Sequence, residues 1–100
     1  MSRRLDEGQS DAGDVAVVKA RREIDAVDRE LLGAVNRRLE LVAALHEHKV
    51  SNGLPLRDPG REDSMIEALR DENPGPLSGE GVEALFHFVL GLIRKEIHGT

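Results

Sequence analysis

The chain has 100 residues and a formal net charge of −5, and 39% of its side chains are hydrophobic and 33% charged. This length is enough for one small domain and excludes a second hydrophobic core. Phe86 and Phe88 are the two aromatic residues and the charge balance is negative, so neither base stacking nor phosphate binding of the kind found in nucleic-acid-binding proteins is expected. The absence of Cys excludes disulfides and thiolate zinc sites.

The N-terminal region is polar. After Met1, residues 1–13 contain one large apolar side chain, Leu5, which is too little to offset the entropy lost on ordering, so we expect a disordered tail. The stretch lacks the apolar segment of a signal peptide, and no run in the chain approaches the about 20 apolar residues of a membrane span. We therefore expect a cytoplasmic protein without a membrane anchor.

The first predicted element is one long helix from Asp14, a candidate N-cap, to Ser51. This stretch has no Pro and no Gly except Gly33, and apolar residues recur along it at helical spacing. Such a helix would be over about 50 Å long, whereas a compact monomer of this size is about 30 Å across. We therefore expect another chain to cover half of it. The apolar stripe consists of Val17, Ala20, Ile24, Val27, Leu31, Val35, Val42 and Leu45.

Two shorter helices follow. Asp58-Pro59 has the N-cap and first-turn proline of a helix start, and the breakers at 73–76 (NPGP) end that helix. Ser78 is the candidate N-cap of a third helix over residues 79–98. The sequence thus predicts an all-α fold of three helices, long, short and medium, in one domain over residues 14–100. The apolar faces comprise Met65, Ile66 and Leu69 in the second helix, and Val82, Leu85, Phe86, Val89, Leu92 or Ile93, and Ile97 in the third.

Three cations interrupt the apolar stripe of the long helix. Steps of three or four residues place Arg21, Arg38 and Lys49 on the packed face. One interpretation is that their long stems pass the core and reach water. The alternative is a cavity that receives an anion, because burying an unpaired cation is unfavourable, and carboxylates are the expected ligands.

The spacing of these cations adds a geometric constraint. Arg38 and Lys49 would lie about 16 Å apart along the helix axis, close enough for both side chains to reach one small ligand, whereas Arg21 would lie about 26 Å from Arg38. In an antiparallel helix pair about a two-fold axis, the Arg21 end of one chain approaches the middle of its partner. We therefore predict a site shared by two copies of the chain.

Asp58, Arg61 and Glu62 cluster at the first turn of the second helix. Asp58 can be an ordinary N-cap and Glu62 can simply favour the positive end of the helix dipole, but both carboxylates can also accept hydrogen bonds from a ligand hydroxyl. The four His residues are not spaced as a metal site, and we find no nucleophile with a neighbouring base and no glycine-rich phosphate loop.

Residues 20–97 resemble the all-helical, intertwined-dimer class of chorismate mutase. Two segments carry the resemblance: ARREIDAVDRELLGAVNRRLELVAALHEHK in the long helix and LPLRDPGRE at the start of the second. It implies an intertwined homodimer that rearranges chorismate to prephenate in the shikimate pathway, without a cofactor or a metal; whether the product enters aromatic amino acid biosynthesis or a specialised pathway stays open. The residues that match the family's separations are Arg21, Ile24, Asp25, Asp28, Arg38, Lys49, Asp58, Arg61 and Glu62.

The resemblance also implies a role for each site residue. Arg38 and the partner's Arg21 would clamp the two carboxylates of chorismate, and Arg61 would add to the positive environment. Lys49 would donate a hydrogen bond to the ether oxygen. Glu62 would accept one from the C4 hydroxyl, with support from Asp58. Lys49, Arg38 and Glu62 are therefore the expected catalytic residues.

The third helix departs from the family, which usually has a Ser there and, four residues later, a Gln that also donates to the ether oxygen. Aligning Leu85-Phe86 with the family's pattern puts Ile93 and Ile97 at these positions, and neither can donate. Either the alignment slips and brings Glu96 or His98 near the site, or Lys49 is the one side-chain donor. Two alternatives therefore stay open: an isochorismate–pyruvate lyase of the same fold, against which Glu62 argues, and a weakly active or regulatory dimer that acts on a partner enzyme of the shikimate pathway.

Overall fold

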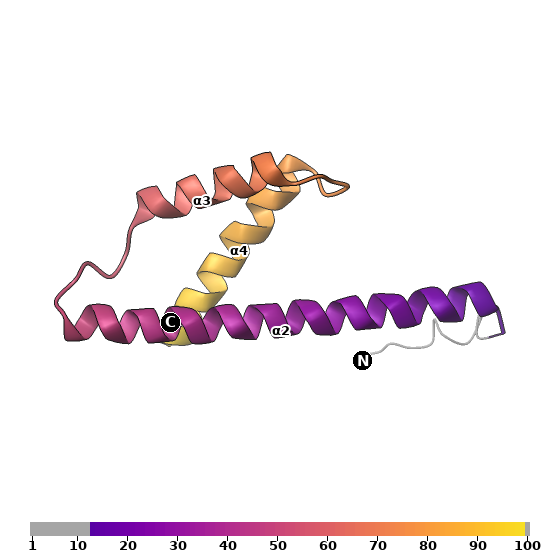
Figure 1. Cartoon of the computed structure of the whole chain (residues 1–100), viewed down its shortest axis with the longest axis horizontal. Helices are drawn as coiled ribbons and strands as arrows, with labels where there is room; N and C mark the ends of the chain where they lie inside the picture. Colours follow the sequence, from indigo (N-terminus) through magenta and orange to yellow (C-terminus); the bar gives the residue numbers. More distant parts are fainter. Residues whose placement is uncertain (1–12, 100) are drawn as a thin grey trace. The chain divides into compact units, whose positions relative to one another are not determined.

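The computed structural model describes residues 13–99 and contains three helices within them, α2 (Val15–Ser51), α3 (Pro59–Glu72) and α4 (Gly79–His98) (Figure 1). No strand occurs among these residues. The predicted all-α fold with a long, a short and a medium helix is confirmed. The predicted tail over residues 1–13 lies, apart from Gly13, outside the described part of the chain.

The predicted caps set the starts of the helices. Each N-cap side chain accepts a hydrogen bond from the backbone N–H three residues later, Asp14 at 3.1 Å, Asp58 at 3.0 Å and Ser78 at 3.0 Å. After α4, Gly99 takes a left-handed conformation with φ of 74°, which glycine adopts without a Cβ clash, and its N–H bonds back to the helix. Helix limits are therefore encoded locally, which is why they were predictable.

The chain divides into two compact units, residues 1–36 and 37–100, and α2 contributes to both. In the second unit α3 packs against α4. The predicted face of α4 includes Leu85, which is 40% exposed, and misses Leu90, which is buried. The contact with α3 decides which flank of the stripe is covered, and the spacing alone does not contain that information. The buried side chains are Ile66 of α3 and Val82, Val89, Leu90 and Ile93 of α4.

Helix α2 has no buried residue although its sequence carries an apolar stripe. Several of its large apolar side chains are at least half exposed, with Leu32 at 62% and Leu41 at 63%. An apolar surface of this kind is typical of a helix that packs against another chain. None of the helices in residues 13–99 is long and apolar enough to cross a membrane. The exposed apolar residues of α2 are Val15, Ile24, Val27, Leu31, Leu32, Leu41, Leu45 and Val50.

Candidate active site

A cavity of about 680 Å³ lies within the second unit, between the C-terminal part of α2, the loop before α3, the first turns of α3 and the last turns of α4. Its charged lining has a formal excess of three positive charges, although the whole chain carries −5. Such a cavity attracts an anion, because its cations are concentrated in one place and partly shielded from water. The charged groups are the cations Arg38, Lys49, Arg57, Arg61 and Arg94 and the carboxylates Asp58 and Glu62.

The cations of α2 are held at the cavity by their position on the helix. Arg38 and Lys49 lie on the same side, three helical turns apart, and both are half-buried. The Nη2 atom of Arg38 is 3.7 Å from the Sδ atom of Met65 on α3. This contact places the Arg38 guanidinium beside the first turns of α3, where the two carboxylates of the site also lie.

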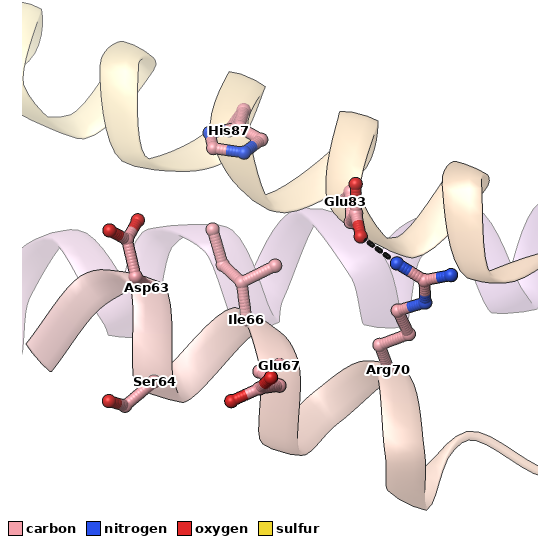
Figure 2. Close-up of a pocket in the computed structure, with 7 residues that line it drawn as sticks. All are labelled: Asp63, Ser64, Ile66, Glu67, Arg70, Glu83 and His87. Atoms are coloured by element: carbon pink, nitrogen blue, oxygen red, sulfur yellow. Dashed lines mark hydrogen bonds and ion pairs between the residues drawn. The ribbon is translucent and has the colours of Figure 1, made fainter. Parts of the chain in front are cut away.

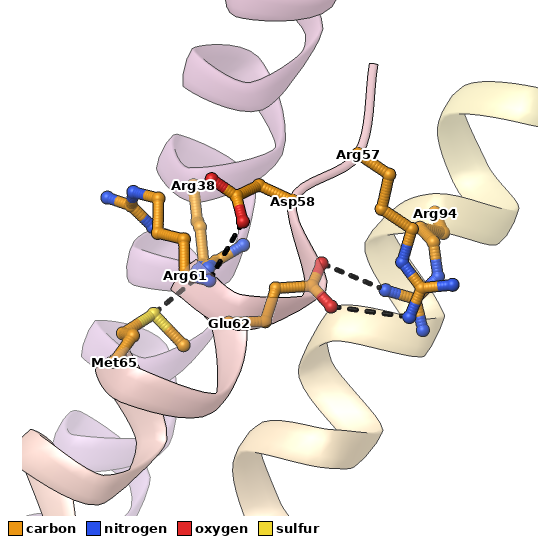
Figure 3. Close-up of polar contacts among 7 residues, drawn as sticks. All are labelled: Arg38, Arg57, Asp58, Arg61, Glu62, Met65 and Arg94. Atoms are coloured by element: carbon orange, nitrogen blue, oxygen red, sulfur yellow. Dashed lines mark hydrogen bonds and ion pairs between the residues drawn. The ribbon is translucent and has the colours of Figure 1, made fainter. Parts of the chain in front are cut away.

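The first turn of α3 supplies Asp58, Arg61 and Glu62. Asp58 accepts a hydrogen bond from the Arg61 backbone N–H and also lines the cavity, so its role as an N-cap does not remove it from the site. Figure 3 shows the side chains of Arg61 and Glu62 extending in opposite directions from this turn. The short helix start therefore places one cation and one carboxylate on different sides of the same cavity.

Glu62 lies between two guanidinium groups (Figure 3). Its Oε1 atom is 3.3 Å from Nη2 of Arg57, and its Oε2 atom is 3.3 Å from Nη1 of Arg94. The Glu62 side chain is 23% exposed, whereas those of Arg57 and Arg94 are 57% and 39% exposed. Both carboxylate oxygens are therefore engaged by groups from outside α3.

The rest of the cavity wall is mostly apolar, which suits the carbon frame of a small ligand. Two His residues stand at one end, where the rings of His46 and His98 meet edge to face with centroids 4.9 Å apart. No group of three or more His, Cys, Asp or Glu in residues 13–99 could hold a metal ion. The apolar lining comprises Leu41, Val42, Leu45, Leu56, Met65, Leu90, Ile93 and Ile97.

The predicted site residues separate into two groups. Five of them, all from residues 38–62, line the one cavity. Arg21 belongs to the first unit, and its predicted part in the site stays a prediction. On α4, Ile93 and Ile97 line the cavity, as the alignment on Leu85-Phe86 predicts; His98 does so too, and Glu96 is not among the lining residues. The five are Arg38, Lys49, Asp58, Arg61 and Glu62.

Sequence reasoning missed two arginines of the cavity, Arg57 and Arg94. Arg94 comes four residues after Leu90 and three before Ile97, so it interrupts the apolar stripe of α4 as Arg38 interrupts that of α2. The same test, applied to the third helix, would have found it. Arg57 lies in a loop, where no periodicity marks it.

The comparisons with known proteins agree with this geometry. Residues 20–97 match the family model of chorismate mutase type II. Two crystal forms of a Thermus thermophilus chorismate mutase have similar structures: form I has a TM-score of 0.75 at 35% identity over 78% of this chain and 98% of that one. Form II has a TM-score of 0.76 at 34% identity over 80% of this chain and 91% of that one.

Longer proteins are also similar to part of this chain. The T-protein of Haemophilus influenzae is 44% identical over 57 residues, which are 57% of this chain and 15% of that protein. A bifunctional chorismate mutase/prephenate dehydratase of Neisseria gonorrhoeae is 35% identical over 77 residues, 77% of this chain and 21% of that protein. The chain thus spans about a fifth or less of the curated relatives it matches. The family match covers most of the chain and all of the cavity except its last residue, so the chain belongs to the chorismate mutase type II family, a family of isomerases.

Proposed function

We propose that this chain rearranges chorismate to prephenate in the cavity described above, with two copies of the chain forming each pair of sites. The observation that carries the proposal is the gathering of five cations and two carboxylates from α2, the loop, α3 and α4 around one cavity. Its volume, about 680 Å³, lies within the about 300–1,000 Å³ of small-molecule sites. Chorismate is a dianion with one ring, which suits both the charge and the apolar wall.

The reaction asks little chemistry of the protein. The ether C–O bond breaks while a C–C bond forms within the same molecule, and no proton transfer or covalent intermediate is needed. Catalysis then consists of holding the flexible dianion in its reactive conformer and stabilising negative charge that develops on the ether oxygen. A rigid, positively charged cavity serves both purposes.

Each cavity residue has a role in this proposal. Arg38, with Arg21 of a second copy, binds the two carboxylates, and Arg61 adds positive potential. Lys49 donates to the ether oxygen. Glu62 accepts a hydrogen bond from the C4 hydroxyl, because an ionised carboxylate is an acceptor without a proton to give. Asp58, at the same turn, supports that contact.

The homodimer in this proposal is supported by α2. Its apolar side chains from Val15 to Val50 are half exposed or more, and a second copy of the same helix offers the complementary apolar surface. A dimer also accounts for Arg21, whose position 17 residues before Arg38 is too far along the helix for both to reach one ligand from the same chain. A cytoplasmic location stays a prediction from the sequence.

The deciding experiment identifies products. The purified chain is incubated with chorismate and, separately, with isochorismate, and products are separated by chromatography and identified by mass; a reaction without protein corrects for spontaneous rearrangement. Prephenate from chorismate supports the proposal. Salicylate and pyruvate from isochorismate would instead indicate the lyase. No product from either would refute an enzymatic role and favour the regulatory dimer, for which the apolar Ile93 and Ile97 on α4 are the specific observation.

A further inference from the structure

Glu62 is held from two sides, and the two holders differ. Arg57 is in the loop before α3 and its side chain is 57% exposed, whereas Arg94 is on α4 and its side chain is 39% exposed. Arg94 directly follows Ile93, which is 2% exposed, so the backbone that carries it is anchored in the core. Arg94 is therefore the more rigid of the two contacts.

The contact leaves Glu62 able to bind a ligand. A carboxylate has two oxygens and about four positions for accepting hydrogen bonds. Arg57 uses one position on Oε1 and Arg94 uses one on Oε2, so one further position on each oxygen remains for a donor inside the cavity. Without Arg94, the three rotatable bonds of Glu62 would be restrained from the loop side only.

We propose that Arg94 is a positioning residue: its guanidinium fixes the Glu62 carboxylate so that a free oxygen position faces the hydroxyl of the bound substrate. Arg94 acts through Glu62 and supplies no separate contact to the reacting atoms. The inference rests on the proposed function, in which Glu62 accepts the substrate hydroxyl, and adds a residue from the third helix to that contact.

The chain contains a matched control. Arg70 and Glu83 also form an ion pair between α3 and α4, at a second cavity of about 350 Å³ (Figure 2). Their side chains are 49% and 41% exposed, comparable with Arg94. Removing this pair perturbs the same helix contact with the same chemistry, but away from the proposed substrate. Any effect that Arg94 has merely as a surface ion pair should appear at Arg70 as well.

The experiment is a cycle of variants assayed with chorismate: Arg94→Gln, Arg94→Lys, Glu62→Gln, and Arg94→Gln combined with Glu62→Gln, with Arg70→Gln as the control. We expect Arg94→Gln to lower kcat/KM about 2- to 12-fold, the factor that corresponds to immobilising one flexible side chain. The loss should divide between kcat and KM as it does in Glu62→Gln. Arg94→Lys should restore part of the activity, and Arg70→Gln should keep it.

The double variant separates the explanations. If Arg94 acts through Glu62, adding Arg94→Gln to Glu62→Gln lowers kcat/KM no further. A multiplied loss would mean that Arg94 contacts the substrate itself, and equal losses in Arg94→Gln and Arg70→Gln would mean a structural ion pair; either result overturns the inference.

A second measurement does not depend on turnover. The side-chain NMR signals of the Arg94 guanidinium should shift in Glu62→Gln and stay in place in Glu83→Gln. If the unchanged protein makes no prephenate, the proposed function fails, and this measurement alone decides whether Arg94 holds Glu62; unmoved signals in Glu62→Gln would refute the contact.

Discussion

Replacing Lys49 by Met separates the catalytic role of this cation from its effect on folding. Met keeps a flexible apolar stem of similar length and removes the charge and the donor. The next cavity cation on the same helix, Arg38, is about 16 Å away along the axis, where repulsion between two unit charges in water is about 0.3 kcal/mol before salt screening. Removing Lys49 should therefore change the free energy of unfolding by less than about 0.5 kcal/mol.

The expected effect on the reaction is much larger. Loss of one donor aimed at developing negative charge costs about 3 kcal/mol, which corresponds to about a hundredfold in kcat. Lys49 is half-buried in the cavity wall, and the two isoleucines that α4 presents there have no donor to replace it. The variant should thus fold like the unchanged protein and turn over chorismate about 100 times more slowly.

Two measurements test this. The decrease in chorismate absorbance gives kcat, and thermal unfolding followed by circular dichroism gives the change in stability. Lys95→Met on α4 is the matched control, because Lys95 is exposed and does not line the cavity. A kcat for Lys49→Met within about threefold of the control would refute the assignment of the ether-oxygen donor, since one donor is worth far more. A fall in melting temperature large enough to unfold the variant at the assay temperature would show that Lys49 is structural.

Three further predictions concern the dimer and the tail. Sedimentation at micromolar concentration should give a mass of about 22 kDa, twice the 11.0 kDa of the chain, and a folded monomer there would contradict the shared site. Arg21→Ala and Lys49→Ala should each be nearly inactive, but a mixture of the two after subunit exchange should recover about a quarter of the activity, because half of the dimers are mixed and each has one intact site. No recovery despite exchange would place both residues in the same chain's site. Deleting residues 1–13 should leave the melting temperature and kcat nearly unchanged, since Leu5 is the one large apolar side chain after Met1; a marked loss of either would show that this segment contributes to the fold.

The sequence by itself determined the helices and most of the charged site. Asp14, Asp58 and Ser78 cap helices through bonds to backbone groups three residues away, so these limits depend on neighbours in the chain alone. Arg38 and Lys49 were recognisable because helical periodicity relates residues on one helix, whatever packs against it. The family resemblance then assigned their roles, which geometry within one helix does not contain.

Only the tertiary structure decided how the third helix meets the other two. The packing of α3 on α4 buries Leu90 and leaves Leu85 exposed, and it places Arg94 next to Glu62, 32 residues earlier in the chain. It also brings Arg57 to the other oxygen of the same carboxylate. These contacts join residues from separate elements, and their geometry follows from the way side chains of both helices fit together in the core, a property of the folded chain that no local pattern in the sequence specifies.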